Sequence, residues 1–582
     1  MLVSALQAGT RYDVVILGTG IGGTILGAIL ARHGQKVLLI EQGVHPRFTI
    51  GESTIPETTI LFRILAARYG VPEIGNLATY QRLNRYVGAS HGVKRNFSFM
   101  YHRPGQAQRP EESSQYPTAA PPYGPDVHMF RQDVDAYMLQ VAMSYGASAV
   151  MRTEVTEVAI DKDGVRLRTK QGTEFTASYV VDAGGLKSML AQTFGLRDQQ
   201  PKLRTRSRSL FTHMVGVKPY DACIPKTHGL FSPLSQGTLH HVFDRGWMWV
   251  IPFNNHPTST NRLVSVGLNL DIDHHPRTGL PPEEEFRQFI SRYPSIAEQF
   301  KDATAAQPWM SSDQLQFSSQ TAVGERFCML PHAFGFVDPL FSSGLGVTMF
   351  AINAIAVRLI RAATDGDYSA ERFAYVDTWT KKNIDFYDRL VSGAYLSFTD
   401  FALWNAWHRL WMIGGMLGPF GQMEIHQRIV NSPSPLTESI TESFPYRAAQ
   451  GYELPEFAAL FDAAESELHA YRDGRCSSKE AATRIFAQIE RSGLWPKPWG
   501  ALSPERRSAG TFTLLPLLKL ALWLGHKSPG SARKYYFKQF GAKDVLKELA
   551  RENLLQLKHA STSYAVMARD TALDWNSDWS HP

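Results

Sequence analysis

Cysteine is scarce: the 582 residues contain only Cys223, Cys328 and Cys476, which lie far apart and form no CxxC pair. This scarcity argues against a disulfide scaffold and against a zinc site, so no metal is predicted. Residues 1–10 lack a basic patch followed by an apolar run, and we therefore expect no secretory signal. No apolar run is expected to be long enough to span a bilayer. These absences favour a cytoplasmic protein.

The excess of positive charge is also modest, because the formal net charge is +6 and only 20% of the residues are charged. The mild basic excess suits an anionic small molecule as well as nucleic acid, but no nucleic-acid-binding motif is found. No internal repeat is evident. The length allows two or more domains, or one large domain with an appended region.

What the sequence does contain begins with a dinucleotide-binding pattern. A buried strand at residues 13–17 is followed by GTGIGG, a helix, a second strand and an acid. In such a motif the first glycine allows a tight turn, the second lets the backbone approach a pyrophosphate, and the third lets helix and strand pack closely. The acid accepts hydrogen bonds from a ribose. The predicted cofactor-binding residues are Gly18, Gly20, Ile21, Gly23 and Glu41.

Three later segments add to this pattern: a helix that opens at Arg131, the strand and glycine turn at residues 179–185, and the turn at residues 335–339 before another helix. Their order resembles the glutathione-reductase-type FAD domain of aromatic hydroxylases. The resemblance implies that Arg131 and Asp338 contact FAD. The alternatives are a surface ion pair for Arg131 and a helix N-cap for Asp338.

The stretch GWMWVIP at residues 246–252 alternates bulky side chains. On a strand, Trp247, Trp249 and Ile251 would share one face, and Met248 and Val250 the other. The strand should end, or lie at a sheet edge, at the proline. The alternative to an aromatic wall beside a flavin is a plain core strand.

Two segments lie between these patterns. Residues 47–56 (RFTIGESTIP) predict a loop that enters a helix. Residues 93–99 alternate polar and apolar side chains, so a strand is expected with Lys94 near its start. Taken alone, Lys94 is most simply a solvated surface charge.

Together the segments resemble flavin-dependent halogenases. The motifs that carry the resemblance occur in the family's order: residues 18–23, GEST at 51–54, Lys94, WMWVIP at 247–252, and DPLFSSG at 338–344. Longer runs resemble the phenol-type branch, which includes bacterial halogenases of phloroglucinol and resorcinol rings. The likeness extends from about residue 12 to about residue 411.

The resemblance implies a chemistry and assigns residues to it. Reduced FAD and O2 would give a flavin hydroperoxide, and chloride or bromide would attack it to form a hypohalous acid. Trp247 and Trp249 would separate flavin from substrate, and Lys94 would activate the hypohalous acid as an ammonium or as a haloamine. The remaining residues assigned by resemblance are Gly51, Glu52 and Ser53 at the cofactor and Ser343 and Gly344 at the halide.

Phe341 stands where tryptophan halogenases carry a glutamate. The absence of that charge argues against free tryptophan and for a small, neutral phenol. Glu52, Glu57 and His102 stay open as the base for the phenolic proton. The alternatives are a ring bound to a carrier protein and a single-component FAD hydroxylase that uses NAD(P)H directly.

The expected fold class is α/β, with a glutathione-reductase-type FAD-binding fold, a mixed-sheet substrate domain and a mostly helical C-terminal region. We expect a core at residues 1–345, with the dinucleotide module at about 10–45 and the substrate sheet at about 85–105 and 205–325. Residues 346–582 would cap the substrate pocket. The apolar segment 513–524 could pack on the core or lie on an anionic membrane surface. A separate flavin reductase is expected as partner, and a homodimer stays open.

Overall fold

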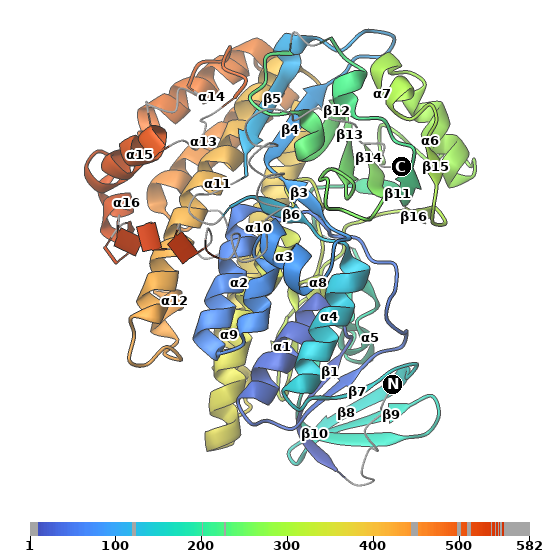
Figure 1. Ribbon diagram of the computed structural model, residues 1–582, viewed down its shortest axis with the longest axis vertical. Coiled ribbons are helices and arrows are strands. Elements are labelled where there is room, and N and C mark those ends of the chain that lie inside the picture. The colour runs from blue at the N-terminus through green and yellow to red at the C-terminus, as the bar shows by residue number, and fades with distance from the viewer. Residues whose placement is uncertain are drawn as a thin grey trace.

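The structure is a computed structural model. It describes residues 10–118, 124–200, 202–225, 228–443, 452–496, 502–508, 514–536, 538, 539, 541, 543, 544, 546, 547, 550, 551 and 554. It has two large mixed sheets and a helical region (Figure 1). The expected α/β class with a glutathione-reductase-type FAD-binding fold is confirmed.

The first sheet contains the dinucleotide module. Its neighbouring strands run in the order β17-β18-β10-β1-β2-β7, with β9 and β8 added beside β10. The strands from β18 to β7 are parallel, because helices cross over between them. The bounds are β1 Arg11–Leu17, β2 Val37–Ile40, β7 Ser148–Val150, β8 Val155–Asp161, β9 Gly164–Thr169, β10 Glu174–Asp182, β17 Val323–Gly324 and β18 Phe327–Met329.

The second sheet is the predicted substrate sheet. Its order is β15-β11-β14-β13-β12-β4-β5, with β16 beside β11. Helices α6 (Pro282–Ile290) and α7 (Pro294–Gln299) cover one face, and α11 (Phe401–Val430) covers part of the other. The strands are β4 Asn96–Tyr101, β5 Ser113–Pro117, β11 Ser207–Val215, β12 Thr238–Phe243, β13 Gly246–Pro252, β14 Val264–Asp271, β15 Thr304–Ala305 and β16 Met310–Ser312.

A small antiparallel pair, β3 (Gly92–Lys94) and β6 (Asp126–His128), lies apart from both sheets. The prediction of one strand starting near Lys94 was therefore wrong. Lys94 ends β3, pairing there with Asp126, and β4 begins anew after Arg95 because it joins the second sheet.

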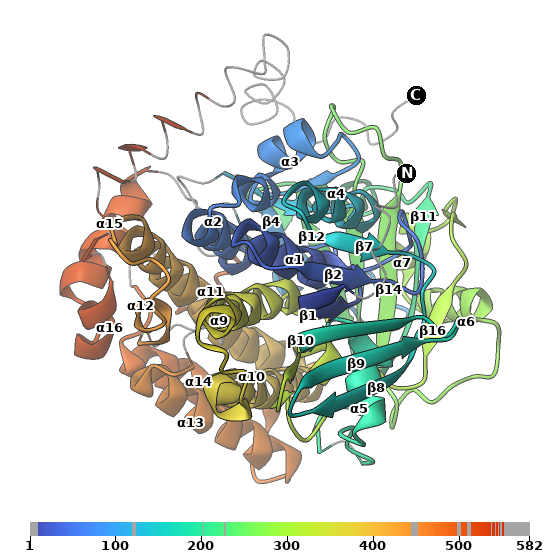
Figure 2. The ribbon, with the colours of Figure 1, turned by 90° about the horizontal axis from the view of Figure 1, so that it is seen from below.

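Helices dominate from residue 344 onward, as predicted. Figure 2 shows α13 to α16 on the side of the molecule opposite β8 and β9. The bounds are α9 Gly344–Asp365, α10 Ala370–Ser397, α12 Ser439–Glu442, α13 Pro455–Arg472, α14 Ser478–Ser492, α15 Leu514–His526 and α16 Gly530–Tyr535. Toward the N-terminus lie α1 Ile21–Arg32, α2 Pro56–Tyr69, α3 Tyr80–Tyr86, α4 Arg131–Ser144, α5 Met189–Thr193 and α8 Pro331–Phe334.

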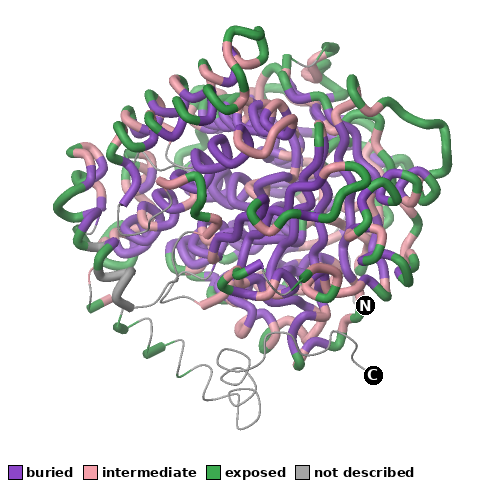
Figure 3. Tube along the Cα trace, turned by 90° about the horizontal axis from the view of Figure 1, so that it is seen from above, coloured by how far each residue is buried: buried purple, intermediate pink, exposed green. Residues whose placement is uncertain are grey.

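One expectation about apolar runs was wrong. Helix α9 has 22 residues and a mean hydropathy of 1.5, so by length and composition it could cross a membrane. However, 89% of its apolar window is buried inside the protein, as in a core helix. Buried residues fill the centre of the molecule in Figure 3. Helix α9 packs on α1 and α2. The proposed boundary at residue 345 and a cytoplasmic location remain predictions.

Candidate active site

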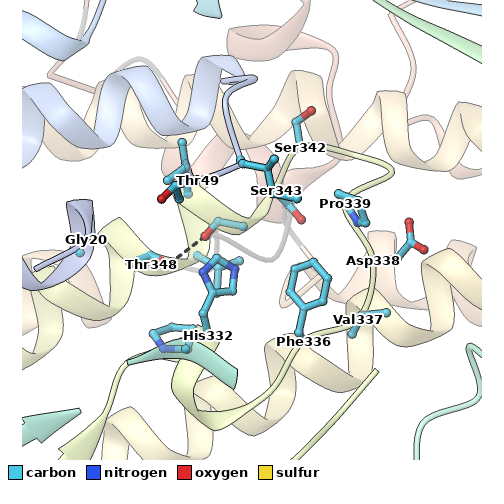
Figure 4. A pocket seen from close by; sticks show the side chains of 18 of the residues that line it. Gly20, Thr49, His332, Phe336, Val337, Asp338, Pro339, Ser342, Ser343 and Thr348 are labelled. Atoms are coloured by element: carbon cyan, nitrogen blue, oxygen red, sulfur yellow. Dashed lines mark hydrogen bonds between the residues drawn. The ribbon is translucent and has the colours of Figure 1, made fainter. Parts of the chain in front are cut away.

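A cavity of about 460 Å³ lies at the carboxyl ends of β1, β10 and β18, where ligands bind in open α/β sheets. Its volume is typical of small-molecule sites. In Figure 4 the segment through Val337, Asp338 and Pro339 passes along the cavity and turns at Ser342 and Ser343. The predicted site residues that line it are Gly20, Ile21, Gly23, Gly51, Glu52, Ser53, Arg131, Trp247, Trp249, Asp338, Ser343 and Gly344. Gly18, Glu41, Lys94 and Phe341 are outside this lining.

The glycines of the dinucleotide motif are needed sterically at two positions. Gly18 has φ +99°, and a Cβ there would lie 2.8 Å from the Ala183 carbonyl oxygen. A Cβ on Gly23 would lie 2.2 Å from the Gly18 oxygen. The N-cap of α1, Gly20, has no side-chain cap bond from any residue described, which leaves the first amides of the helix to a ligand. This end of the cavity therefore fits the pyrophosphate of FAD.

Glu41 lies just behind the motif. Its carboxylate accepts hydrogen bonds from the Thr19 amide at 3.0 Å, the Thr19 hydroxyl at 2.9 Å and the Gly43 amide at 2.9 Å. Burial raises the pKa of Glu41, but the amide hydrogen bonds from Thr19 and Gly43, the charge of Arg47 and the Thr19 hydroxyl together hold the pKa below its ordinary value. The carboxylate thus fixes the turn, and its contact with a ribose remains a prediction.

Arg131 begins α4 and is buried. Its guanidinium pairs with Asp135 at 2.9 Å and donates to the Ile50 carbonyl at 3.0 Å, so it holds the loop of residues 47–53. A Cβ on Gly51, whose φ is +94°, would lie 3.2 Å from the same guanidinium. The alternative of a surface ion pair was wrong, because the pair is buried and Arg131 lines the cavity.

Asp338 is not the N-cap of α9, since Ser343 occupies that position. One of its oxygens accepts from the Ser207 hydroxyl and from the Tyr395 hydroxyl, each at 3.0 Å. The other accepts from the Leu340 amide at 3.0 Å. Burial raises the pKa of Asp338 to about 6, although these hydrogen bonds lower it. The N-cap interpretation was therefore wrong.

The predicted halide turn has the geometry of an anion nest. Ser342 has φ +54° and Ser343 has φ −81° and ψ −19°, so a left-handed residue precedes a right-handed one at the start of α9. Ser343 has no side-chain cap bond within the described structure, so the first amides of α9 stay available. A Cβ on Gly344 would lie 2.8 Å from His332 Nε2. Burial lowers the pKa of His332 to about 4, so this neighbour is neutral near pH 7.

The tryptophan strand has the predicted alternation. Trp247, Trp249 and Ile251 line the cavity, whereas Met248 and Val250 belong to the core under α6 and α7. The strand ends at Pro252 as expected, but it is central, between β12 and β14. The Trp249 ring fills the space above Gly267, where a Cβ would lie 2.0 Å from it. Glycine in β14 is thus what allows the indole to lie across that strand.

Lys94 is completely buried, so the alternative of a solvated surface charge was wrong. Its Nζ donates to Ser53 Oγ at 2.8 Å and to the Thr54 carbonyl at 2.6 Å. Nζ also lies 4.2 Å from the centroid of the Phe97 ring. Burial lowers the pKa of Lys94 to about 7, with nearby Asp126 opposing the shift. Since Ser53 lines the cavity, the amine is one hydrogen bond behind its wall.

An aromatic cluster surrounds this amine. His240 stacks on Phe97 with centroids 4.3 Å apart and contacts Trp247 at 5.6 Å. Trp411 of α11 lies 4.8 Å from Phe97 and stacks on Phe341 at 5.2 Å. The segment at residues 397–411 therefore packs on the sheet and walls the region beside Lys94. His240 and the Trp247 ring that it contacts both line the cavity, so this cluster adjoins it.

The three candidate bases have different surroundings. Glu52 is paired with His213 at 3.0 Å. His102 is bonded to His241 at 2.9 Å and lies near Tyr220 and Tyr293, on the sheet face under α7, which removes it as a candidate. Glu57 is buried on α2, and its Oε1 has no hydrogen-bond partner among the described residues. Burial raises the pKa of Glu57 to about 8.

Several polar groups at the site carry no motif in a single sequence and were missed. Thr238, His240 and His332 line the cavity, and His128 lies behind it. Ser342 was inside the recognised turn, but no role was assigned to it. Only its positive φ and its bond to Ser53 at 3.2 Å distinguish it.

The comparisons with known proteins agree with this geometry. The family model described as tryptophan halogenase matches residues 13–74 and 102–408. The chain is 45% identical over 532 residues to monodechloroaminopyrrolnitrin halogenase PrnC of Pseudomonas fluorescens, covering 90% of this chain and 94% of that protein. It is 40% identical over 532 residues to tetracycline 7-halogenase of Kitasatospora aureofaciens, covering 89% and 94%.

Among solved structures, the halogenase PltM in complex with phloroglucinol and FAD superposes with a TM-score of 0.82 at 33% identity. The match covers 86% of this chain and 99% of that one. The family model spans more than half of the sequence, and the relatives are similar over nearly their whole length. The chain therefore belongs to the flavin-dependent halogenases, enzymes that act on aromatic substrates.

Proposed function

We propose that this enzyme chlorinates or brominates an electron-rich phenolic ring, using reduced FAD, O2 and a halide ion. The observation that carries the proposal is the buried Lys94 amine. It lies behind a cavity walled by Trp247 and Trp249 and is linked to that cavity through Ser53. A small oxidised halogen species could reach such an amine, whereas a direct contact between flavin and substrate would be blocked.

The residues that would hold FAD are those of the α1 turn, the loop of residues 47–53, Arg131 and the indole wall. When bound, reduced FAD supplies the electrons with which O2 is activated to oxidise the halide. Ser343 and Gly344 would hold the halide through their amides, since a nest at a helix N-terminus favours an anion. His332, whose Nε2 faces Gly344, is neutral near pH 7 because burial lowers its pKa to about 4.

Lys94 would act on the hypohalous acid. With a pKa of about 7, both its protonation states are populated near neutral pH. The ammonium can donate a proton to the oxygen of the hypohalous acid, which then leaves as water while the ring takes the halogen. The ring proton returns to a base, so that ArH and HOX give ArX and water. The neutral amine could instead form a haloamine.

The surroundings of Lys94 support the proposed substrate class. Phe341, Phe97 and Trp411 offer apolar surface and no charge, which suits a neutral ring. A phenolic oxygen donates electrons into the ring, so less activation is needed from the protein. The phloroglucinol in the PltM complex supports this class, since phloroglucinol is a phenol.

The test combines the purified protein with FAD, a flavin reductase, NADH, chloride and a panel of phenols and indoles. We expect halogenated phenols by mass spectrometry, and loss of about three orders of magnitude or more in turnover for Lys94→Met. FAD affinity of this variant, measured by fluorescence, should be unchanged because Lys94 lies outside the cavity lining. Turnover by Lys94→Met close to that of the unaltered enzyme would remove Lys94 from the mechanism.

Other outcomes would identify other functions. NADH oxidation by the protein alone, with oxygen insertion in the absence of halide, would indicate a single-component hydroxylase. Halogenation only of rings attached to a carrier protein would replace the free phenol as substrate. Omitting the reductase from the complete mixture tests whether a separate reductase is required.

A further inference from the structure

We propose that Thr238 and His128 are positioning residues that, through Ser53, fix the direction in which the Lys94 amine can react. This inference rests on the proposed function. Four buried side chains form one chain of hydrogen bonds from His128 to Lys94, and neither Thr238 nor His128 carries a sequence motif. The direction of every bond in this chain can be derived from its end.

The chain of hydrogen bonds ends at His128. Its Nδ1 lies 2.8 Å from the Pro252 carbonyl oxygen, which can only accept a hydrogen bond. Nδ1 therefore carries the proton. Burial lowers the pKa of His128 to about 3, and Lys94 contributes to the shift, so the ring is neutral near pH 7. Its Nε2 must then accept from Thr238 Oγ1, which lies 2.9 Å away.

The hydroxyls follow in sequence. Because the Thr238 hydroxyl donates its single hydrogen to His128, its oxygen must accept from Ser53 Oγ, 2.8 Å away. The Ser53 hydroxyl in turn donates its single hydrogen to Thr238. Its oxygen is left as an acceptor for Lys94 Nζ at 2.8 Å and for Ser342 Oγ at 3.2 Å. Each hydroxyl thus has only one arrangement that satisfies all of its partners.

These hydrogen bonds fix the orientation of the Lys94 amine. Ser53 Oγ and the Thr54 carbonyl both accept from Nζ, so two of its three substituent directions are fixed. The third direction holds a proton in the ammonium and the lone pair in the amine. Without the hydrogen bonds to Thr238 and His128, the Ser53 hydroxyl could rotate, donate to the lone pair of the neutral amine and block it. The network therefore reserves one direction for the oxidised halogen.

Two other titratable groups, Asp126 and His240, interact with the charge of this amine and belong in any account of its pH dependence. Asp126 pairs with Lys94 across β3 and β6, and burial raises its pKa to about 8. The ring of His240 on β12 also lies in the surroundings of Lys94, and burial holds its pKa well below the ordinary value. Glu57 lies on the first turn of the neighbouring α2. The proposed variants leave all three unchanged.

The experiment compares Thr238→Val with Thr238→Ser in the FAD-loaded enzyme, measuring kcat and KM across pH. In Thr238→Val the Ser53 hydroxyl has lost its acceptor, so it can rotate and donate a hydrogen bond to the lone pair of the neutral Lys94 amine. In the plot of kcat against pH, the limb that reports the ionisation of Lys94 should then move to lower pH by about half a unit or more. At pH 7 kcat should fall about tenfold with KM for the phenol little changed. Thr238→Ser restores the hydroxyl, so its kcat and its limb should return toward the original.

A second pair breaks the chain at a residue outside the cavity lining. His128→Asn keeps a donor for the Pro252 carbonyl but loses the acceptor for Thr238. His128→Gln can present an acceptor at the former Nε2 position. We expect the shifted limb in the first variant and rescue in the second. If Thr238→Val fails to bind FAD, this pair decides the question.

The outcomes separate this inference from the proposed function. If the unaltered enzyme does not halogenate, or Lys94→Met does, the proposed function fails. If halogenation depends on Lys94 but the limb stays in place in Thr238→Val and His128→Asn, the network is only structural and the inference is overturned. An equal loss of kcat in both members of a pair, with no shift of the limb, has the same meaning.

Discussion

The dinucleotide module and the Lys94 site are built in opposite ways. The module is formed within residues 11–41 by glycines whose backbones approach other backbones closely. The Lys94 site draws single polar side chains from separate segments of the chain: Ser53, Lys94, His128, Thr238 and Ser342. Substitutions in the module should therefore act through steric overlap, whereas those near Lys94 should act through hydrogen bonding and charge.

The largest effect is expected in the module. A Cβ in Gly23→Ala would lie 2.2 Å from the Gly18 oxygen, so the turn must open. We expect FAD affinity, measured by fluorescence titration, to fall by up to about a hundredfold, because such overlap costs up to about 3 kcal/mol.

The matched control is Gly34→Ala at the end of α1. Gly34 has φ +81°, but its Cβ would meet no atom of the described structure within 4 Å. Backbone strain should cost about 1 kcal/mol of stability with FAD affinity unchanged. Equal FAD affinities for the two variants would contradict a module held by close backbone approach.

The next effect tests the boundary between the two regions. In Gly267→Ala the new Cβ would lie 2.0 Å from the Trp249 ring, which must swing away. We expect a loss of about 1–3 kcal/mol in the free energy of unfolding. Escape of oxidised halogen to a soluble scavenger should increase, since the indole wall is displaced.

Met248→Leu on the opposite face of the same sheet is the control. It should cost less than about 1.5 kcal/mol and release no more oxidised halogen than the unaltered enzyme. Equal leakage from Gly267→Ala and Met248→Leu would show that the wall does not contain the oxidant.

The smallest effect concerns the buried carboxyl group of Glu57 on α2. The pKa of Glu57 is raised to about 8, so the protonated form is favoured by folding. Its contribution to stability is complete below the ordinary pKa of about 4.5 and is lost as pH rises toward 8. Between pH 6 and pH 7 the unaltered enzyme should lose up to about 1.4 kcal/mol relative to Glu57→Gln in denaturant titrations.

Glu41→Gln in the module provides the contrast. The pKa of Glu41 is lowered, so its contribution is present above its ordinary pKa and is lost only as pH falls below it. The stability difference between this variant and the unaltered enzyme should therefore stay constant from pH 6 to pH 7. A constant difference for Glu57→Gln as well would mean that Glu57 is ionised in the fold.

Local patterns were sufficient where neighbours in the sequence decide the structure. The strand, glycine turn and helix of the module were predicted because they follow one another in one short segment, in which Gly23 packs against Gly18, although Gly18 also approaches the distant Ala183. The two faces of β13 were predicted because strand geometry alternates regardless of context. Helix α4 begins at Arg131 as expected, and the turn before α9 begins with the residues predicted for it.

Patterns failed where the partner is distant in the sequence. The N-cap, given as the alternative for Asp338, is not formed, because its carboxylate accepts from the hydroxyls of Ser207 and Tyr395, 131 and 57 residues away. His102 was a candidate base until the sheet turned it toward the α7 side. Lys94 resembled a surface charge because its acceptors come from the loop before α2.

The sequence alone therefore determined the FAD-binding fold, the indole strand and the family, since each is written in short motifs with local physical causes. Tertiary structure decided which polar groups are buried and which partners they find. Hydrogen-bond direction and burial depend on residues such as Ser53, in the loop before α2, and Thr238, in β12, which lie 185 residues apart and meet only in the folded structure.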